Sequence, residues 1–354
     1  MLLRAALALL SVGIAMIGRG LPAANAQASY TVFEITTLSE GGTRVVRGLN
    51  DAGNVAGGAK IGSALRAFVA GTGRPLVFVG PPGTDYSAAM GINGVGKVIG
   101  SANTATAVRA FRSSTNGVVS DLGTLPGDTG SQAFAINASG QVVGLSSGPT
   151  GIRAVVWERD GAIRELPTIS GARGSRALAI NDAGDAVGAA DTAFGSQAVA
   201  WSGATVRALG TLPGHRASQA VGINNQGDIV GYSEEARGVR HAVLWSPGAA
   251  PQDLGALTTD GFTVAQGIND RTQVVGSSET SGGLHAFLWT SQNGIRDLNA
   301  LVALPAGIVL KQAAAISTQG SILALGQDEG VAEPGHAHDL HELPLKIFVL
   351  VPHP

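Results

Sequence analysis

The sequence contains no cysteine among its 354 residues. Disulfides, thiolate nucleophiles, cysteine metal ligands and a lipid anchor attached through cysteine are therefore all excluded. Aromatic residues make up only 5% of the chain and charged residues 14%, and the charges are scattered singly with a formal net charge of −2. Because no Lys/Arg cluster could neutralise a run of phosphates, we do not expect nucleic-acid binding.

Long apolar runs are missing from the body of the chain, so no transmembrane helix is expected there. The N-terminus differs: Arg4 precedes a 13-residue apolar run, AALALLSVGIAMI, at residues 5–17, and ANA follows at residues 24–26. These features are typical of a secretory signal peptide, with a first buried helix as the alternative. We therefore expect residues 1–26 to be removed and the mature protein to be secreted or periplasmic.

Glycine is abundant, with 52 residues, and much of it belongs to a ten-residue motif such as AINASGQVVG at residues 135–144. A degenerate copy, AISTQGSILA, begins at residue 315. The seven copies are marked by the Asn of the motif or the Ser that replaces it: Asn50, Asn93, Asn137, Asn181, Asn224, Asn269 and Ser317. Steps of 43 to 48 residues match a four-stranded propeller blade or a two-helix repeat of the HEAT type. The glycines, the Val/Ile alternation and the lack of a helical apolar stripe favour strands.

One repeat accommodates four short strands. In the copy that begins at Val118, the pattern predicts strands at residues 118–125, 131–137, 141–147 and 153–157. The period is therefore that of one antiparallel blade.

The turn between the second and third strands depends on Asn137 and Gly140. Asn suits the first position because its side chain bonds the backbone ahead of it, and Gly tolerates a positive φ. In the sixth copy Thr272 stands where glycine is expected. Because a β-branched residue is strained at positive φ, we predict a different turn there.

A single sheet of this kind cannot bury both faces, whereas seven sheets arranged radially can cover one another. We therefore predict an all-β fold, a seven-bladed β-propeller of four-stranded antiparallel blades, as the one domain of residues 27–354. A lone strand at residues 31–38 matches the first strand of a repeat, and residues 345–351 match the fourth. Pairing of these N-terminal and C-terminal strands would complete the seventh blade and leave no exposed edge.

Charged residues recur 12 positions apart in several repeats and predict the register of one hairpin. Four pairs have this spacing: Arg109 and Asp121, Arg153 and Glu165, His241 and Asp253, and His285 and Asp297. We expect the members of each pair to lie opposite each other, because opposite charges attract across a hairpin. A ring of basic donors for an anionic ligand is the alternative, but the matched acids favour ion pairs.

The remaining blades bear on the same interpretation. Across the ring closure, the corresponding residues Lys346 and Glu34 are again opposite in charge. In the blade where Ala208 replaces the acid, the residue at the basic position is the neutral Gln197. Arg66 and Phe78 are the exception, and nothing in the sequence explains them.

Three runs resemble a known family. They are DLGTLPGDTGSQAFAINASGQVVG, LGTLPGHRASQAVGINNQGDIVGYS and INDRTQVVGSSETSGGLHAFLWT. They look like the extracellular HAF-repeat proteins, whose His-Ala-Phe corresponds here to His285, Ala286 and Phe287. The resemblance covers essentially the whole mature chain and is weakest in the last repeat. It implies export and a repeat fold, and it brings no established reaction or catalytic residues.

Loops that precede the inner strands should gather on one rim of the ring. Six residues of these loops could converge near the central channel: Asp85, Asp128, Arg173, His215, Arg216 and Asp260. Loops on a rigid scaffold often carry function, although solvated turn residues are the simpler interpretation.

Polar residues also occupy matched places on the inner strands: Ser87, Ser131, Ser175 and Ser218, with Gln132, Arg176 and Gln219 beside them. Such hydroxyls could line a channel that holds water or a sugar. Alternatively, neighbouring backbone groups satisfy them.

The segment GHAHDLHEL, between Gly335 and Leu343, holds the densest set of metal-ligand types. Its His336, His338, Asp339 and His341 suit zinc or copper. A solvated histidine-rich loop is the alternative, and we assign no metal or other cofactor.

Enzyme signatures are missing: there is no G-x-S-x-G, no H-E-x-x-H and no phosphate loop. We therefore assign no catalytic residue and expect a monomeric binding module for an extracellular protein or carbohydrate. The alternative is a polysaccharide hydrolase or lyase that uses Asp85, Asp128 or Asp260. It requires two of these carboxyls within roughly 5–10 Å of each other.

Overall fold

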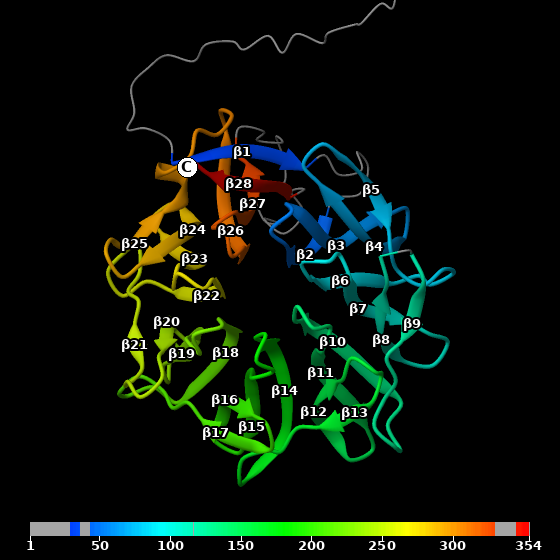
Figure 1. Ribbon diagram of the computed structural model, residues 1–354. Coiled ribbons are helices and arrows are strands. Elements are labelled where there is room, and N and C mark those ends of the chain that lie inside the picture. Colours follow the sequence, from blue (N-terminus) through cyan, green and yellow to red (C-terminus); the bar gives the residue numbers. More distant parts are fainter. Residues whose placement is uncertain (1–28, 36–42, 116, 330–344, 354) are drawn as a thin grey trace, which may run out of the picture.

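The computed structural model describes residues 29–35, 43–115, 117–329 and 345–353. In these residues the strands form seven four-stranded antiparallel sheets, which are arranged radially in a ring (Figure 1). The predicted seven-bladed β-propeller is therefore confirmed. The signal-peptide segment and the histidines at 336, 338 and 341 lie outside the described residues.

Blades 1 to 6 each consist of four consecutive strands, innermost first. Blades 1 to 3 comprise β2 (Thr43–Leu49), β3 (Asn54–Ile61), β4 (Ala64–Gly71) and β5 (Arg74–Phe78); β6 (Ser87–Ile92), β7 (Val98–Asn103), β8 (Val108–Ser113) and β9 (Val119–Asp121); and β10 (Gly130–Ile136), β11 (Val142–Gly148), β12 (Gly151–Trp157) and β13 (Ile163–Glu165). Blades 4 to 6 comprise β14 (Ala172–Ile180), β15 (Ala186–Thr192), β16 (Gly195–Ser202) and β17 (Thr205–Ala208); β18 (Ala217–Ile223), β19 (Ile229–Glu234), β20 (Arg240–Trp245) and β21 (Gln252–Asp253); and β22 (Thr263–Ile268), β23 (Val274–Thr280), β24 (Gly283–Thr290) and β25 (Gly294–Asp297). A short 3-10 helix, η1 (Leu298–Ala300), follows blade 6.

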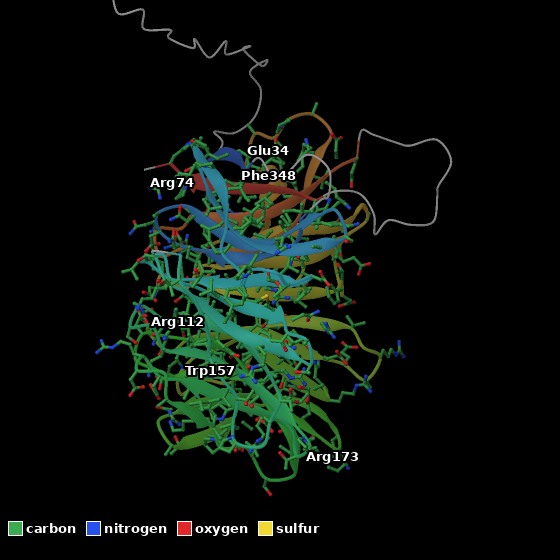
Figure 2. The ribbon with its side chains drawn as sticks, turned by 90° about the vertical axis from the view of Figure 1, so that its right-hand side faces the viewer. Glu34, Arg74, Arg112, Trp157, Arg173 and Phe348 are labelled. Atoms are coloured by element: carbon green, nitrogen blue, oxygen red, sulfur yellow. The ribbon has the colours of Figure 1, made fainter. Side chains whose placement is uncertain are left out.

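Blade 7 joins the two ends of the chain. It consists of β26 (Ile308–Ile316), β27 (Ile322–Asp328), β28 (Lys346–Pro352) and, at the outer edge, β1 (Tyr30–Ile35). The register of β1 and β28 is antiparallel and places Glu34 opposite Phe348 (Figures 1 and 2). The predicted ring closure is confirmed, and no blade is left with only three strands.

The core lies between neighbouring blades. Trp201 of blade 4 packs against Val143 and Val156 of blade 3, for example. Close packing also explains the glycine that ends the repeated motif. A Cβ at Gly144 would lie 1.9 Å from the Gln132 carbonyl oxygen and 2.9 Å from the Trp157 ring, so only glycine leaves room for both.

The Asn of the motif forms hydrogen bonds in two blades. Its side-chain oxygen accepts the backbone N–H four residues ahead, as Asn137 does from Gln141 at 2.9 Å. Its side-chain nitrogen donates to the carbonyl of the corresponding residue in the next blade, as Asn137 does to Asn181 at 3.1 Å. The same donation recurs at 3.0–3.2 Å at six junctions, from Asn50, Asn93, Asn137, Asn181, Asn224 and Asn269.

The seventh junction is held differently because Ser317 replaces Asn. Its hydroxyl accepts the turn N–H of Ser321 at 3.2 Å, but a hydroxyl is too short to bridge blades as an amide does. Instead the next residue, Thr318, donates its N–H and its hydroxyl to Asp51 of blade 1, at 2.9 and 2.7 Å. Every junction therefore has a polar link on this face of the ring.

The prediction of a different turn at Thr272 is wrong. Thr272 adopts φ 54°, and its N–H bonds the Asn269 carbonyl at 3.0 Å as glycine does in the other copies. Its hydroxyl donates to the Asp228 carboxylate at 2.9 Å. A hydrogen bond to a charged group contributes about 1.5–3 kcal/mol, which offsets a left-handed strain of about 1–3 kcal/mol.

The charge pairs at 12-residue spacing are confirmed as contacts. Their distances are 3.0 Å for Arg109 and Asp121, 3.1 Å for Arg153 and Glu165, 3.1 Å for His241 and Asp253, 2.7 Å for His285 and Asp297, and 3.9 Å for Lys346 and Glu34.

The predicted register of these pairs is wrong. Asp121 lies opposite Phe111, two residues beyond Arg109, so the partners are diagonal. Long side chains reach across such a diagonal. Because the acids are largely exposed, each pair contributes at most about 1 kcal/mol.

The interblade amide bond predicts a specific loss of stability. Asn93→Ser keeps an acceptor for its own turn, as Ser317 does, but loses the donor to Asn137. We expect the free energy of unfolding to fall by about 1–3 kcal/mol in urea denaturation. The control is Asn103→Ser, at an exposed strand end, with a change within about 0.5 kcal/mol. Equal effects of the two substitutions would show that the bond is dispensable.

Candidate functional site

Each of the seven inner strands carries a β-bulge at the same place in the repeat. In β10, Ala133 pairs with Gly144 and Ala135 with Val143, so Phe134 between them has no partner. The corresponding residue is also skipped in each of the remaining six blades. We call these seven the bulge residues: Arg47, Met90, Phe134, Leu178, Val221, Gln266 and Ala314.

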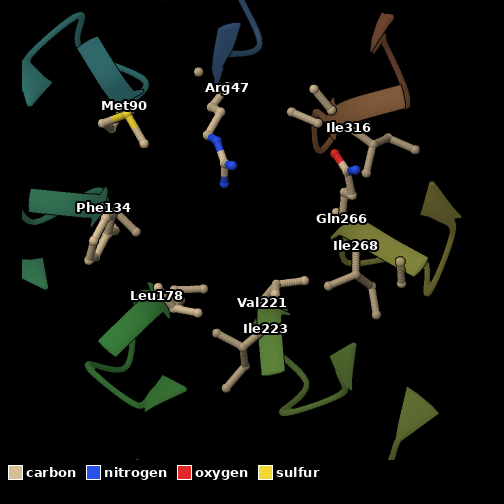
Figure 3. Close-up of a pocket in the computed structure, with 18 of the residues that line it drawn as sticks. Arg47, Met90, Phe134, Leu178, Val221, Ile223, Gln266, Ile268 and Ile316 are labelled. Carbon is tan, nitrogen blue, oxygen red and sulfur yellow. The ribbon is translucent and has the colours of Figure 1, made fainter. Parts of the chain in front are cut away.

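The bulges direct these side chains toward the axis of the ring. An extra residue in one strand re-aims its side chain away from the pleat. All seven bulge residues line one central cavity of about 600 Å³, and Figure 3 shows six of them around the opening. One position of the repeat therefore contributes a lining residue from every blade.

The bulge residues make one side of the cavity apolar. Met90, Phe134, Leu178 and Val221, on blades 2 to 5, form an apolar belt. On the opposite side, Arg47 directs its guanidinium into the open space (Figure 3), and the Gln266 side-chain oxygen accepts a hydrogen bond from the Gln312 amide. In the described part of the chain no carboxylate forms an ion pair with Arg47, so this guanidinium supplies an unpaired positive charge.

A second polar group lies on blades 4 and 5. The Arg240 guanidinium lies 4.3 Å from the centre of the Tyr232 ring and 2.9 Å from Glu234, while Arg176 pairs with Asp191. Both cations are thus neutralised locally. Burial raises the pKa of Tyr232, against a smaller lowering by Arg240, so the phenol stays protonated at neutral pH, and it donates a hydrogen bond to the Gln219 side-chain oxygen at 3.3 Å.

Toward the motif turns, an apolar collar separates the cavity from its mouth. It is formed by the residue before each motif Asn or Ser: Leu49, Ile92, Ile136, Ile180, Ile223, Ile268 and Ile316. Beyond it a mouth of about 280 Å³ includes the acids Asp51, Asp182 and Asp270. Each of these carboxylates accepts a backbone N–H of the preceding blade at 2.9, 2.9 and 2.8 Å, which holds the mouth in shape.

The four inner-strand serines do not line the central cavity; neighbouring backbone satisfies them instead. The hydroxyls accept backbone N–H groups of the preceding blade at 3.0–3.1 Å: Ser87 from Ala67, Ser131 from Ala110, Ser175 from Ala154 and Ser218 from Ala198. Of their predicted polar neighbours, Arg176 and Gln219 line the cavity, whereas Gln132 is not among its lining residues.

The six loop residues do not converge on the cavity, and none of them lines it. The Asp128 carboxylate contacts Arg153 at 2.8 Å and Ser146 at 2.6 Å. Arg216 contacts Glu234 at 3.4 Å, and the His215 ring packs on His241. The other three, Asp85, Arg173 and Asp260, are exposed, and Figure 2 shows Arg173 at the edge of the molecule.

Reasoning from the sequence missed the bulge residues. A signal for them is present, because the position three residues before the motif Asn varies from Arg to Phe to Gln while the positions after it keep the pattern Gly/Ala-Ile-Asn. A freely varying position inside a constrained motif indicates a side chain outside the core.

The fold is shared with known proteins. No protein-family model and no curated protein matches the chain. A streptogramin B lyase matches with TM-score 0.54 and 14% identity, covering 93% of this chain and 100% of that one. A catalytically inactive virginiamycin B lyase from Staphylococcus aureus gives 0.54 and 16%, with 92% and 100% covered. The RRP9 WD40 repeats give 0.55 and 12%, with 92% and 99% covered.

The chain shares the propeller fold of these structures. Because the sequence identities are this low, the similarity gives no information about individual cavity residues. Among the described residues, no helix has the length and apolar character needed to cross a membrane.

The bulge geometry predicts opposite effects at neighbouring positions. Leu178→Gln faces the cavity, where blade 6 already has Gln266, and we expect a loss of less than about 1 kcal/mol. Ala177→Gln, at a fully buried position between blades, combines overpacking with a buried amide and should cost about 3 kcal/mol or more. Urea denaturation measures both. A larger loss at 178 than at 177 would contradict the assignment of the bulge.

Proposed function

We propose that this protein is an exported, non-catalytic binding module whose central cavity holds part of a partner protein. The observation that carries the proposal is the ring of bulge residues. It places an apolar belt opposite the unpaired Arg47 in a cavity of about 600 Å³. In a bound segment with an apolar side chain next to a carboxylate, the side chain would contact the belt and the carboxylate would pair with Arg47.

The chemistry of the cavity favours a protein segment over a carbohydrate. Only two aromatic rings, those of Phe134 and Tyr232, are among its lining residues, and the belt offers no hydrogen-bond partners for hydroxyls. A sugar would bury polar groups there without partners, which is unfavourable. A peptide side chain or chain end buries apolar surface instead.

The alternative of a polysaccharide hydrolase or lyase receives less support. Its three candidate acids, Asp85, Asp128 and Asp260, are not among the cavity residues, and Asp128 is already engaged by Arg153. The similarity to two lyases extends to the fold alone.

Binding can be tested with a library of hexapeptides that carry a free C-terminal carboxylate. We expect enriched peptides to combine an acidic group with large apolar residues. Arg47→Glu should weaken the affinity of the best peptide at least about tenfold, because it replaces attraction with repulsion. The matched control is Arg74→Glu, on the exposed β5.

Three outcomes would overturn the binding proposal. They are an empty peptide screen, equal affinities of Arg47→Glu and Arg74→Glu, and enrichment from a glycan array in place of the peptide library. Enrichment from the glycan array would indicate that the cavity binds a carbohydrate.

Export and membership of the HAF-repeat family belong to the same proposal, supported by the signal-like N-terminus and the repeated motifs. Mass spectrometry of the secreted or periplasmic protein should find an N-terminus at Gln27. Because the cleavage site needs small residues, Ala26→Phe should leave the leader attached. An unprocessed chain confined to the cytoplasm would contradict export.

A further inference from the structure

Two histidines and one glutamate meet at a corner of blade 5, away from the central cavity. His215 lies just before β18, Glu235 just after β19, and His241 in β20. One ligand atom of each lies within 4.8 Å of the others. The His241 Nε2 and Glu235 Oε1 atoms are 3.4 Å apart. This equals the separation of about 3.4 Å between two ligand atoms held tetrahedrally at about 2.1 Å from zinc.

The orientation of His241 is fixed by Asp253. The imidazole Nδ1 lies 3.1 Å from the Asp253 carboxylate and donates to it. In the neutral ring, Nε2 therefore carries a lone pair that faces the Glu235 carboxylate. Two acceptors facing each other repel unless a proton or a cation lies between them. A carboxylate behind the histidine is also the usual support of a zinc ligand.

His215 supplies a further free nitrogen. Its Nδ1 atom is buried and has no hydrogen-bond partner among the described residues. The His215 and His241 rings are 5.0 Å apart and nearly perpendicular, at 79°. A buried nitrogen without a partner is unfavourable, and a metal ion would give it one.

The corresponding corner of blade 3 holds different side chains at the same positions of the repeat. Asp128 and His215 each lie nine residues before the motif Asn, and Arg153 and His241 each lie 12 residues before the paired acid. In blade 3, the Arg153 guanidinium bridges Asp128 at 2.8 Å and Glu165 at 3.1 Å. In blade 5 both members are imidazoles, so no permanent cation fills the corner.

Two carboxylates at the blade 5 corner have no permanently charged cation as an ion-pair partner among the described residues. Glu234 is paired with Arg216 at 3.4 Å and with Arg240 at 2.9 Å. Glu235 and Asp253, in contrast, contact only imidazoles among the ion pairs of the described residues. A divalent ion bound by neutral histidines would balance both carboxylates.

We propose that His215, His241 and Glu235 form a zinc site, with Asp253 as the positioning residue behind His241. Two imidazoles, one carboxylate and an open fourth position for water are a ligand set that Zn²⁺ takes readily. The ion would tie the hairpin of β19 and β20 to the loop before β18. The site lies in blade 5, so zinc binding there does not depend on whether a ligand occupies the central cavity.

Isothermal titration with ZnCl₂ tests the site. All measurements use the full chain with His336, His338 and His341 changed to alanine, so that their segment contributes no signal. We expect one equivalent of zinc to bind. The double variant His215→Ala/His241→Ala should bind none. The matched control is His285→Ala, which removes the equivalent pair with Asp297 in blade 6 and should bind zinc normally.

Two further variants keep the test decisive if the double variant does not fold. Glu235→Gln, at a partly exposed side chain, should lower zinc affinity without affecting the fold. Asp253→Asn should lower it about 10–100-fold, and Co²⁺ bound in place of zinc should show the visible spectrum of a tetrahedral site. No zinc binding by the starting protein, or equal binding by the Glu235→Gln and His285→Ala variants, would overturn the proposal.

Discussion

The ring depends on an asparagine side chain that belongs to two blades at once. Its oxygen closes the turn of its own blade, and its nitrogen binds the backbone of the next. Aspartate lacks the donor, and serine lacks the reach, so the motif retains Asn at six of seven copies. Where Ser317 stands instead, Asp51 and Thr318 carry the link. Because these amides are buried, leaving one unpaired would be costly, and neighbouring blades are held in a fixed relation.

This rigid frame frees one position of the repeat. The bulge removes a single residue from the ladder in each inner strand, while the residues around it pack between blades or form the apolar collar. A side chain that neither pairs nor packs can change without disturbing the fold. Seven such positions around one axis produce a cavity whose chemistry is set residue by residue, from Arg47 through Phe134 to Gln266.

The sequence predicted the parts of the structure that follow from periodicity. The Asn spacing gave the blade count, the lone terminal strands gave the closure, and the 12-residue spacing gave the charge contacts. The bulge was missed because its signal is the variability of one position within the motif, and that variability identifies a skipped residue once the register is known. Because the register was unknown, the pairs were expected directly opposite rather than diagonal. The sequence left Asp128 and His215 between the channel and solvated turns, because loop position alone does not reveal which neighbour a side chain meets.

Repetition also explains how one structural corner diverges between blades. Blade 3 fills it with a guanidinium between two carboxylates, and blade 6 with one imidazole–carboxylate pair. Blade 5 combines two imidazoles with two carboxylates. The three blades share the strand framework, but the hairpin between β19 and β20 is longer than that between β11 and β12, and its loop contributes Glu235. Positions that hold Asp128 and Arg153 as an ion pair in blade 3 thus hold His215 and His241, two ligands of the proposed zinc site, in blade 5.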